Sequence, residues 1–125
     1  MKQTINTDLA PAPVGPYSPA LKAGNLLFIS GQIPLTSSGT MVEGDFEQET
    51  RQVLNNIDAL LTASQLTFSD VVKINIFTTD LAQFDLINRV YAEFVSAPFP
   101  ARAAVEVAAL PKGARIEMEA IAYVK

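Results

Sequence analysis

Apolar residues recur at helical spacing in two stretches of the chain, 45–61 and 80–96. Each stretch opens with Asp-x-x-Gln, in which the aspartate can cap the first turn and the glutamine can bond back to it. Pro98 and Pro100 follow the second stretch and prevent it from continuing as helix. The pattern therefore predicts two amphipathic helices, each with one apolar face for packing.

Other stretches are rich in β-branched and small residues and predict strands. They are a short edge strand at Lys2–Asn6, a buried strand at Asn25–Ser30, and strands at Asp70–Thr79, 101–109 and 114–124. Four prolines between positions 11 and 19 predict that Ala10–Ala20 is extended and lies on the surface. Alternation in the 70–79 strand predicts one face made by Val72, Ile74 and Ile76, and the opposite face made by Lys73, Asn75 and Phe77.

The order of these elements predicts how they are connected. The strand at 70–79, the helix at 80–96 and the strand at 101–109 form a right-handed βαβ crossover with parallel strands. Leu110–Gly113 is predicted to join the last two strands as a hairpin. Together they give an α/β (α+β) fold in which a mixed sheet carries both helices on one face.

The other sheet face is predicted to lack a cover within the subunit. We expect it to bear the side chains of Lys73, Phe77, Arg102, Ala104 and Glu117. A partner subunit is the natural cover for such a face, and a pocket between subunits is the natural place for a site.

Length and composition limit the class of protein. The 125 residues suffice for one domain, 1–125. Nearly half of them, 49 %, are hydrophobic and the mean hydropathy is +0.22, yet no apolar run approaches the roughly 18 residues of a membrane span. An oligomer is expected to bury the surplus apolar surface, and no membrane association is expected. The first residues lack the apolar core of a secretory signal, so we expect a cytoplasmic protein.

The absence of cysteine and histidine narrows the chemistry. It removes thiol nucleophiles, Ser-His pairs and most zinc sites, so no metal or cofactor is expected. Carboxylates, Arg, Lys, Tyr, hydroxyls and backbone groups are left for catalysis. The net charge is −4, from nine basic and thirteen acidic residues, and the basic residues do not cluster. Nucleic acid is therefore not an expected partner.

Arg102, Glu117 and Glu119 bring charge into the alanine-rich C-terminal strands, and two interpretations are open. Arg102 can form a cross-strand ion pair with either glutamate, worth about 1 kcal/mol or less. Alternatively, its planar guanidinium holds a substrate carboxylate while a glutamate handles a water molecule.

Two further positions also have a structural and a functional interpretation. Gly31, between Ser30 and Gln32, indicates either a β-bulge or a place where a ligand meets the main chain. Tyr17, within the proline-rich segment, either pins that loop to the body or presents its hydroxyl beside a pocket.

Three segments of the chain form recognisable motifs: Gly15-Pro16-Tyr17-Ser18, Ile29-Ser30-Gly31-Gln32-Ile33-Pro34, and Pro100-Ala101-Arg102-Ala103-Ala104-Val105 with Ile116-Glu117-Met118 after it. In residue type and spacing they resemble the Rid/YjgF/UK114 family of reactive-intermediate deaminases, and the resemblance covers essentially the whole sequence. The resemblance implies a chorismate-mutase-like subunit, a homotrimer with clefts between subunits, and hydrolysis of 2-iminobutanoate and 2-iminopropanoate to 2-keto acids and ammonia.

The resemblance also implies roles for single residues. Arg102 would hold the substrate carboxylate and Glu117 would activate the water. The remaining contacts would come from Tyr17, Ser30, Gly31, Asn88 and the backbone at Ala104, where many similar proteins have cysteine. Glu106 and Glu119 are expected to be structural and to pair with Arg115 or Lys112.

Two other functions compete with the deaminase. One is a non-catalytic trimer that binds small carboxylates or a regulatory protein in the same cleft. The other is an endoribonuclease or translation inhibitor, a role attributed to some similar proteins, which the acidic balance disfavours.

Overall fold

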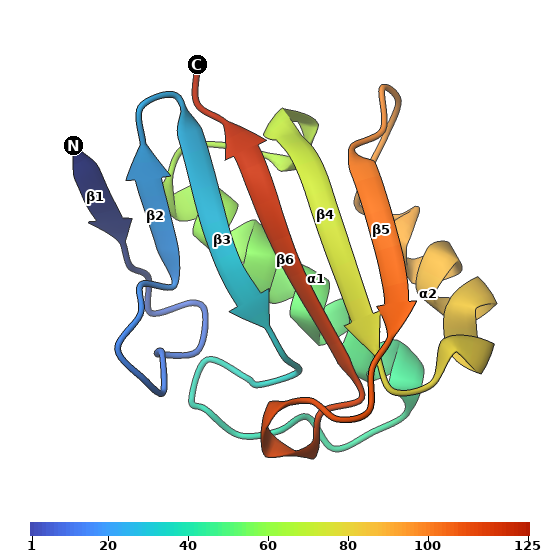
Figure 1. Cartoon of the computed structure of the whole chain (residues 1–125). Helices are drawn as coiled ribbons and strands as arrows, with labels where there is room; N and C mark the ends of the chain where they lie inside the picture. Colours follow the sequence, from blue (N-terminus) through green and yellow to red (C-terminus); the bar gives the residue numbers. More distant parts are fainter.

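Six strands form one mixed sheet in the computed structural model, which describes residues 1–125 (Figure 1). Their spatial order is β1-β2-β3-β6-β4-β5. Only β4 and β5 are parallel, and every other neighbouring pair is antiparallel. The strands are β1 (Lys2–Ile5), β2 (Ala20–Ala23), β3 (Leu26–Gln32), β4 (Val71–Thr78), β5 (Ala101–Glu106) and β6 (Ile116–Tyr123).

The helices α1 (Phe46–Ala63) and α2 (Phe84–Tyr91) cover one face of this sheet, as predicted (Figure 1). Short 3-10 turns occur at Phe68–Asp70, Leu81–Gln83 and Pro111–Gly113. The core lies between the helices and the sheet, where the largest buried side chains are leucine, isoleucine and methionine. The opposite face has no element over it and leaves Phe28 and Tyr123 exposed. Neither helix has the length and apolar composition needed to cross a bilayer.

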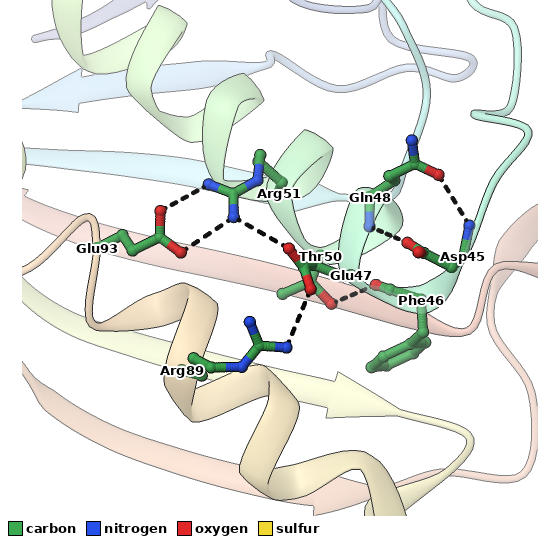
Figure 2. Close-up of polar contacts among 8 residues, drawn as sticks. All are labelled: Asp45, Phe46, Glu47, Gln48, Thr50, Arg51, Arg89 and Glu93. Carbon is green, nitrogen blue, oxygen red and sulfur yellow. Dashed lines mark hydrogen bonds and ion pairs between the residues drawn. The ribbon is translucent and has the colours of Figure 1, made fainter.

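The predicted start of α1 is confirmed. The Asp45 carboxylate accepts a hydrogen bond from the backbone N–H of Gln48 at 2.9 Å, and the Gln48 side chain accepts one from the N–H of Asp45 at 3.0 Å (Figure 2). This reciprocal pair is a capping box.

The second helix is shorter than predicted, and its capping box is absent. Asp80 accepts from Ala82 N–H and starts a 3-10 turn, after which α2 begins at Phe84 without a side-chain cap. The Glu106 carboxylate accepts from Leu81 N–H at 2.9 Å. Thr78 Oγ1, rather than the glutamine, accepts from the Asp80 N–H at 3.2 Å, and the Glu106 contact from β5 holds the next N–H of the turn.

The predicted hairpin between the last two strands is wrong. β4 lies between β5 and β6, and the connection from β5 to β6 crosses the end of β4, where Val107 N–H donates to Thr78 O and Thr79 N–H donates to Arg115 O. The reason is the difference in burial. β6 buries every second residue and suits the centre of the sheet, whereas β5 is exposed along most of its length and suits an edge. The parallel β4–α2–β5 crossover is confirmed.

Two details of the strands also differ from the predictions. β2 was not predicted, because it begins directly after the proline-rich segment. Val72 is 45 % exposed and does not share the core face of Ile74 and Ile76; Val71 is buried instead. The register of β4 against β6 shifts between Val71 and Lys73, so a β-bulge breaks the alternation there.

A network of four charged residues joins the two helices at the surface (Figure 2). Arg51 of α1 donates two hydrogen bonds to the Glu93 carboxylate, each 3.0 Å, and lies 3.5 Å from Glu47. Arg89 of α2 donates to Glu47 at 3.0 Å. The network therefore holds α2 and the turn after it against α1.

Candidate functional site

The largest cavity of the chain, about 430 Å³, lies between the proline-rich segment and the ends of β3 and β6. Proline and aliphatic side chains form much of its wall: Pro11, Pro13, Val14, Ile33, Leu35 and Pro111. Its polar groups come from Tyr17, Ser30, Gly31, Gln32, Glu117 and Glu119. Four of the predicted site residues, Tyr17, Ser30, Gly31 and Glu117, are therefore together.

Glu117 is the chemically most unusual group of this cavity. Its side chain is half-buried and accepts no hydrogen bond from the chain. Burial, and next the negative charge of Glu119, raise the pKa of the Glu117 carboxyl above its usual value. A half-desolvated carboxylate with a raised pKa is suited to accepting a proton near neutral pH.

The absence of a side chain at Gly31 leaves room for the Glu117 carboxylate. A Cβ at residue 31 would lie 2.6 Å from Glu117 Oε2 and 2.8 Å from its Cδ, closer than side-chain atoms approach. Of the two interpretations of this glycine, the β-bulge is confirmed, because β3 has one extra residue relative to β6 between Ile29 and Gln32. The bulge and the missing side chain together bring the Glu117 carboxylate against the main chain of β3.

Ser30 and Tyr17 differ in how free their hydroxyls are. Ser30 Oγ donates to Ser18 O at 2.6 Å, and Ser30 N–H donates to Pro19 O at 2.9 Å. Ser30 thus ties the proline-rich segment to β3. Tyr17 lines the cavity and is 47 % exposed, and its hydroxyl makes no hydrogen bond within the chain.

Arg102, Asn88 and Ala104 do not lie with the other predicted residues. In the β4–β5 register, Arg102 is opposite Ile74 and Ala104 is opposite Ile76, both of which face the helices. The expectation that Arg102 and Ala104 share the uncovered face with Glu117 is therefore wrong. Glu117 is opposite Phe77, whose side chain alternates with those of the core residues, so within one chain Arg102 and Glu117 lie on opposite faces of the sheet.

On the helix side, Arg102 contacts one stripe of α2. Its Nη1 donates to Asn88 Oδ1 at 2.7 Å, and its Cζ lies 5.4 Å from the centre of the Phe84 ring and 5.1 Å from that of Tyr91. The guanidinium is exposed, and no carboxylate pairs with it. Its remaining N–H groups are free to bind an anion.

The predicted ion pairs of the C-terminal strands are also wrong. Arg102 pairs with neither Glu117 nor Glu119. Glu119 accepts from Asn75 Nδ2 at 3.0 Å, and Glu106 accepts from the backbone of Leu81. Arg115 instead binds the buried Glu49 of α1 and lies over the ring of Phe46. The insertion of β4 between β5 and β6 moves Arg102 away from Glu117 and Glu119 and Glu106 away from Arg115, whereas Glu119 and Arg115 are separated because each binds a different neighbour, Asn75 and Glu49.

Sequence reasoning missed two aromatic residues beside Arg102 and the proline wall of the cavity. Phe84 and Tyr91 were assigned only to the apolar pattern of the second helix. Their spacing from Asn88 was the available signal, because residues i, i+4 and i+7 of a helix share one face. No group of three or more acidic side chains converges to form a metal site.

Comparisons with known proteins add to this geometry. The model of the family described as Endoribonuclease L-PSP matches residues 7–124. A RutC family protein of Pyrococcus horikoshii is 52 % identical over 124 residues, 98 % of each chain. The 2-iminobutanoate/2-iminopropanoate deaminase of Dermatophagoides farinae is 46 % identical over 125 residues, 99 % of this chain and 98 % of that protein. The structure of E. coli TdcF with bound serine superposes with a TM-score of 0.92 at 36 % identity, covering 98 % of this chain and 99 % of that one.

Proposed function

The chain belongs to the Endoribonuclease L-PSP family, the Rid/YjgF family that its motifs resemble, and from this membership we propose that it hydrolyses 2-imino acids to 2-keto acids and ammonia. The substrates are 2-iminobutanoate and 2-iminopropanoate, the compounds in the name of the relative from Dermatophagoides farinae. The apolar walls of the cavity suit the short alkyl side chains of both.

One observation carries the proposal: the chain holds both groups that the reaction needs, but on opposite sides of its sheet. Glu117 is a half-buried base without a cation beside it, and Arg102 is a cation without an anion beside it. Each group supplies what the other lacks. We therefore propose that the protein is a homotrimer in which the Arg102 of one subunit reaches the cavity of the next, so that every site lies between two subunits.

The uncovered sheet face supports this assembly. It leaves Phe28 and Tyr123 exposed, and Val105, opposite Phe77 in the register, is exposed on the same side. Apolar side chains on an unpartnered sheet face favour burial against another copy of the chain.

The groups account for the reaction without a covalent intermediate. Arg102 binds the substrate carboxylate through the N–H groups that Asn88 leaves free, and this orients C2 of the protonated imine. Glu117 takes a proton from a water molecule, and the oxygen of this water bonds to C2 while the C=N double bond becomes a single bond. Glu117 then returns the proton to the amine nitrogen. The C–N bond breaks and ammonia leaves as the C–O bond becomes the keto C=O, and the hydroxyl proton passes to solvent. The products are the 2-keto acid, ammonia and a proton.

Relatives support the substrate class. The relative from Dermatophagoides farinae carries the deaminase name, and E. coli TdcF binds serine, whose carboxylate, amine-bearing carbon and short side chain have the outline of a small imino acid. The proposal extends these names to this chain because Arg102 and Glu117 are both present.

A coupled assay tests the proposal. Threonine dehydratase releases 2-iminobutanoate, and formation of 2-oxobutanoate is followed with and without the protein. We expect the protein to accelerate hydrolysis over the spontaneous rate and the Arg102→Ala variant to lose that acceleration. Its circular dichroism should be unchanged, because Arg102 is exposed and lies outside the core of the subunit. Its oligomeric state, measured in parallel, should also be unchanged, because the apolar sheet face is intact. A wild-type protein that binds 2-oxobutanoate but leaves hydrolysis at the spontaneous rate would instead be the non-catalytic carboxylate binder.

A further inference from the structure

Three side chains of α2 converge on the Arg102 guanidinium. Phe84, Asn88 and Tyr91 occupy positions i, i+4 and i+7 of this helix, so they form one stripe along it. The Asn88 amide oxygen binds Nη1 at 2.7 Å, and both aromatic rings lie within the distance at which a cation is attracted to a ring.

Without such contacts, this arginine would be poorly ordered. It is on an edge strand, its side chain is exposed and it has no ionic partner. A free arginine side chain samples many rotamers, and fixing it at the moment of binding would cost affinity. A guanidinium that is already held has less freedom to lose.

Tyr91 acts through its ring. It is only 6 % exposed, and its hydroxyl is buried without a hydrogen-bond partner. Burial raises the pKa of the Tyr91 hydroxyl, against an opposing effect of the nearby Arg102 charge, so the side chain stays an uncharged phenol at neutral pH. The contact with Arg102 is therefore one between a cation and an aromatic face, and phenylalanine would preserve it.

We propose that Phe84 and Tyr91 are positioning residues: their rings hold the Arg102 guanidinium in the orientation that receives the substrate carboxylate. The inference rests on the proposed function for the role of Arg102 as the carboxylate ligand. Neither aromatic residue needs to touch the reacting atoms.

Steady-state kinetics with 2-iminobutanoate test the proposal through a split between KM and kcat. Phe84→Leu and Tyr91→Leu are each expected to raise KM about 2- to 5-fold with kcat nearly unchanged, because the carboxylate is bound alike in the ground and transition states. Tyr91→Phe should keep the wild-type KM. Phe94→Leu is the matched control, since Phe94 is also a half-buried phenylalanine near α2 but packs against Phe68.

A second measurement does not depend on catalysis. Nitrogen-15 NMR of the Arg102 Nε–H group, assigned by its loss in Arg102→Lys, reports the ring-current shift and the mobility of the guanidinium in the substrate-free protein. Phe84→Leu should reduce the ring-current shift and increase the mobility, and Phe94→Leu should change neither. If Tyr91→Leu fails to fold, Phe84→Leu alone tests the proposal.

The outcomes separate the two proposals. Unchanged KM and unchanged Arg102 mobility in Phe84→Leu would overturn the positioning role, as would equal losses in Phe84→Leu and Phe94→Leu. A wild-type protein without turnover, whose Arg102 is nevertheless ordered by Phe84, would refute the deaminase and support the positioning role.

Discussion

Replacing Gly31 by alanine tests how closely the Glu117 carboxylate must approach the main chain. The new Cβ would lie 2.6 Å from Oε2, 2.8 Å from Cδ and 3.2 Å from Cγ of Glu117. A normal contact requires about 3.5 Å, so the carboxylate must move by roughly 1 Å. It is the far end of a flexible side chain, and we therefore expect it to move without disrupting the sheet.

The expected loss is in catalysis. A displacement of this size can reduce turnover about 100-fold, which is about 2.7 kcal/mol of barrier at 25 °C. The free energy of unfolding should fall by about 1 kcal/mol or less, because the bulge backbone is retained. The assay is kcat for 2-iminobutanoate beside urea unfolding of the same preparation.

Gly15→Ala provides the matched control for this prediction. Gly15 adjoins Tyr17 of the cavity, and a Cβ there would make only ordinary contacts, 3.6 Å from the Tyr17 ring. The control should keep wild-type turnover. Wild-type kcat in Gly31→Ala would refute the reasoning, because the carboxylate would then tolerate a different position.

Four further predictions concern charge. Glu117→Gln should lower kcat by about 100-fold or more with little change in KM, measured by steady-state kinetics. Glu119→Gln should shift the acidic limb of the pH–rate profile to lower pH, because it removes the second of the two causes that raise the pKa of Glu117. Because the pKa of Glu117 is raised in the folded protein, its ionised form destabilises the fold at pH 7. Glu117→Gln should therefore have a higher melting temperature than the wild type at pH 7, and the difference should vanish below the usual glutamate pKa of about 4.3. The Arg51 hydrogen bonds lower the pKa of Glu93, so Glu93→Gln should reduce the melting temperature at neutral pH. This difference in melting temperature should disappear as the pH falls through the lowered pKa, and it should be smaller in high salt.

Features that depend on residues close together in the sequence were predictable. The Asp45 and Gln48 capping box depends on two residues three positions apart, and the Gly31 bulge on one residue within a strand. The βαβ crossover also followed from consecutive elements, because a parallel pair needs a helix-length connection.

Features that depend on strand order were not predictable. Alternation shows that Arg102 and Ala104 share a face of one strand, but it does not show which face that is. The predicted hairpin placed them with Glu117, whereas pairing with β4 turns Arg102 toward α2. The second Asp-x-x-Gln motif failed for a more local reason: Asp80 caps the turn, but Thr78, two residues before it, accepts from the Asp80 N–H that the glutamine was expected to bind.

Mixed assemblies of two inactive variants test the central claim, that a site combines Glu117 of one subunit with Arg102 of the next. Arg102→Ala and Glu117→Gln chains, carrying different tags, are co-expressed and the mixed oligomers are purified. In a cyclic trimer, each mixed assembly regains one intact site in three. Random assembly of equal amounts of the two chains makes about three quarters of the trimers mixed, so the unfractionated mixture should recover about a quarter of wild-type turnover. Mixed oligomers as inactive as their parents would contradict the account, because each site would then need both residues from the same chain.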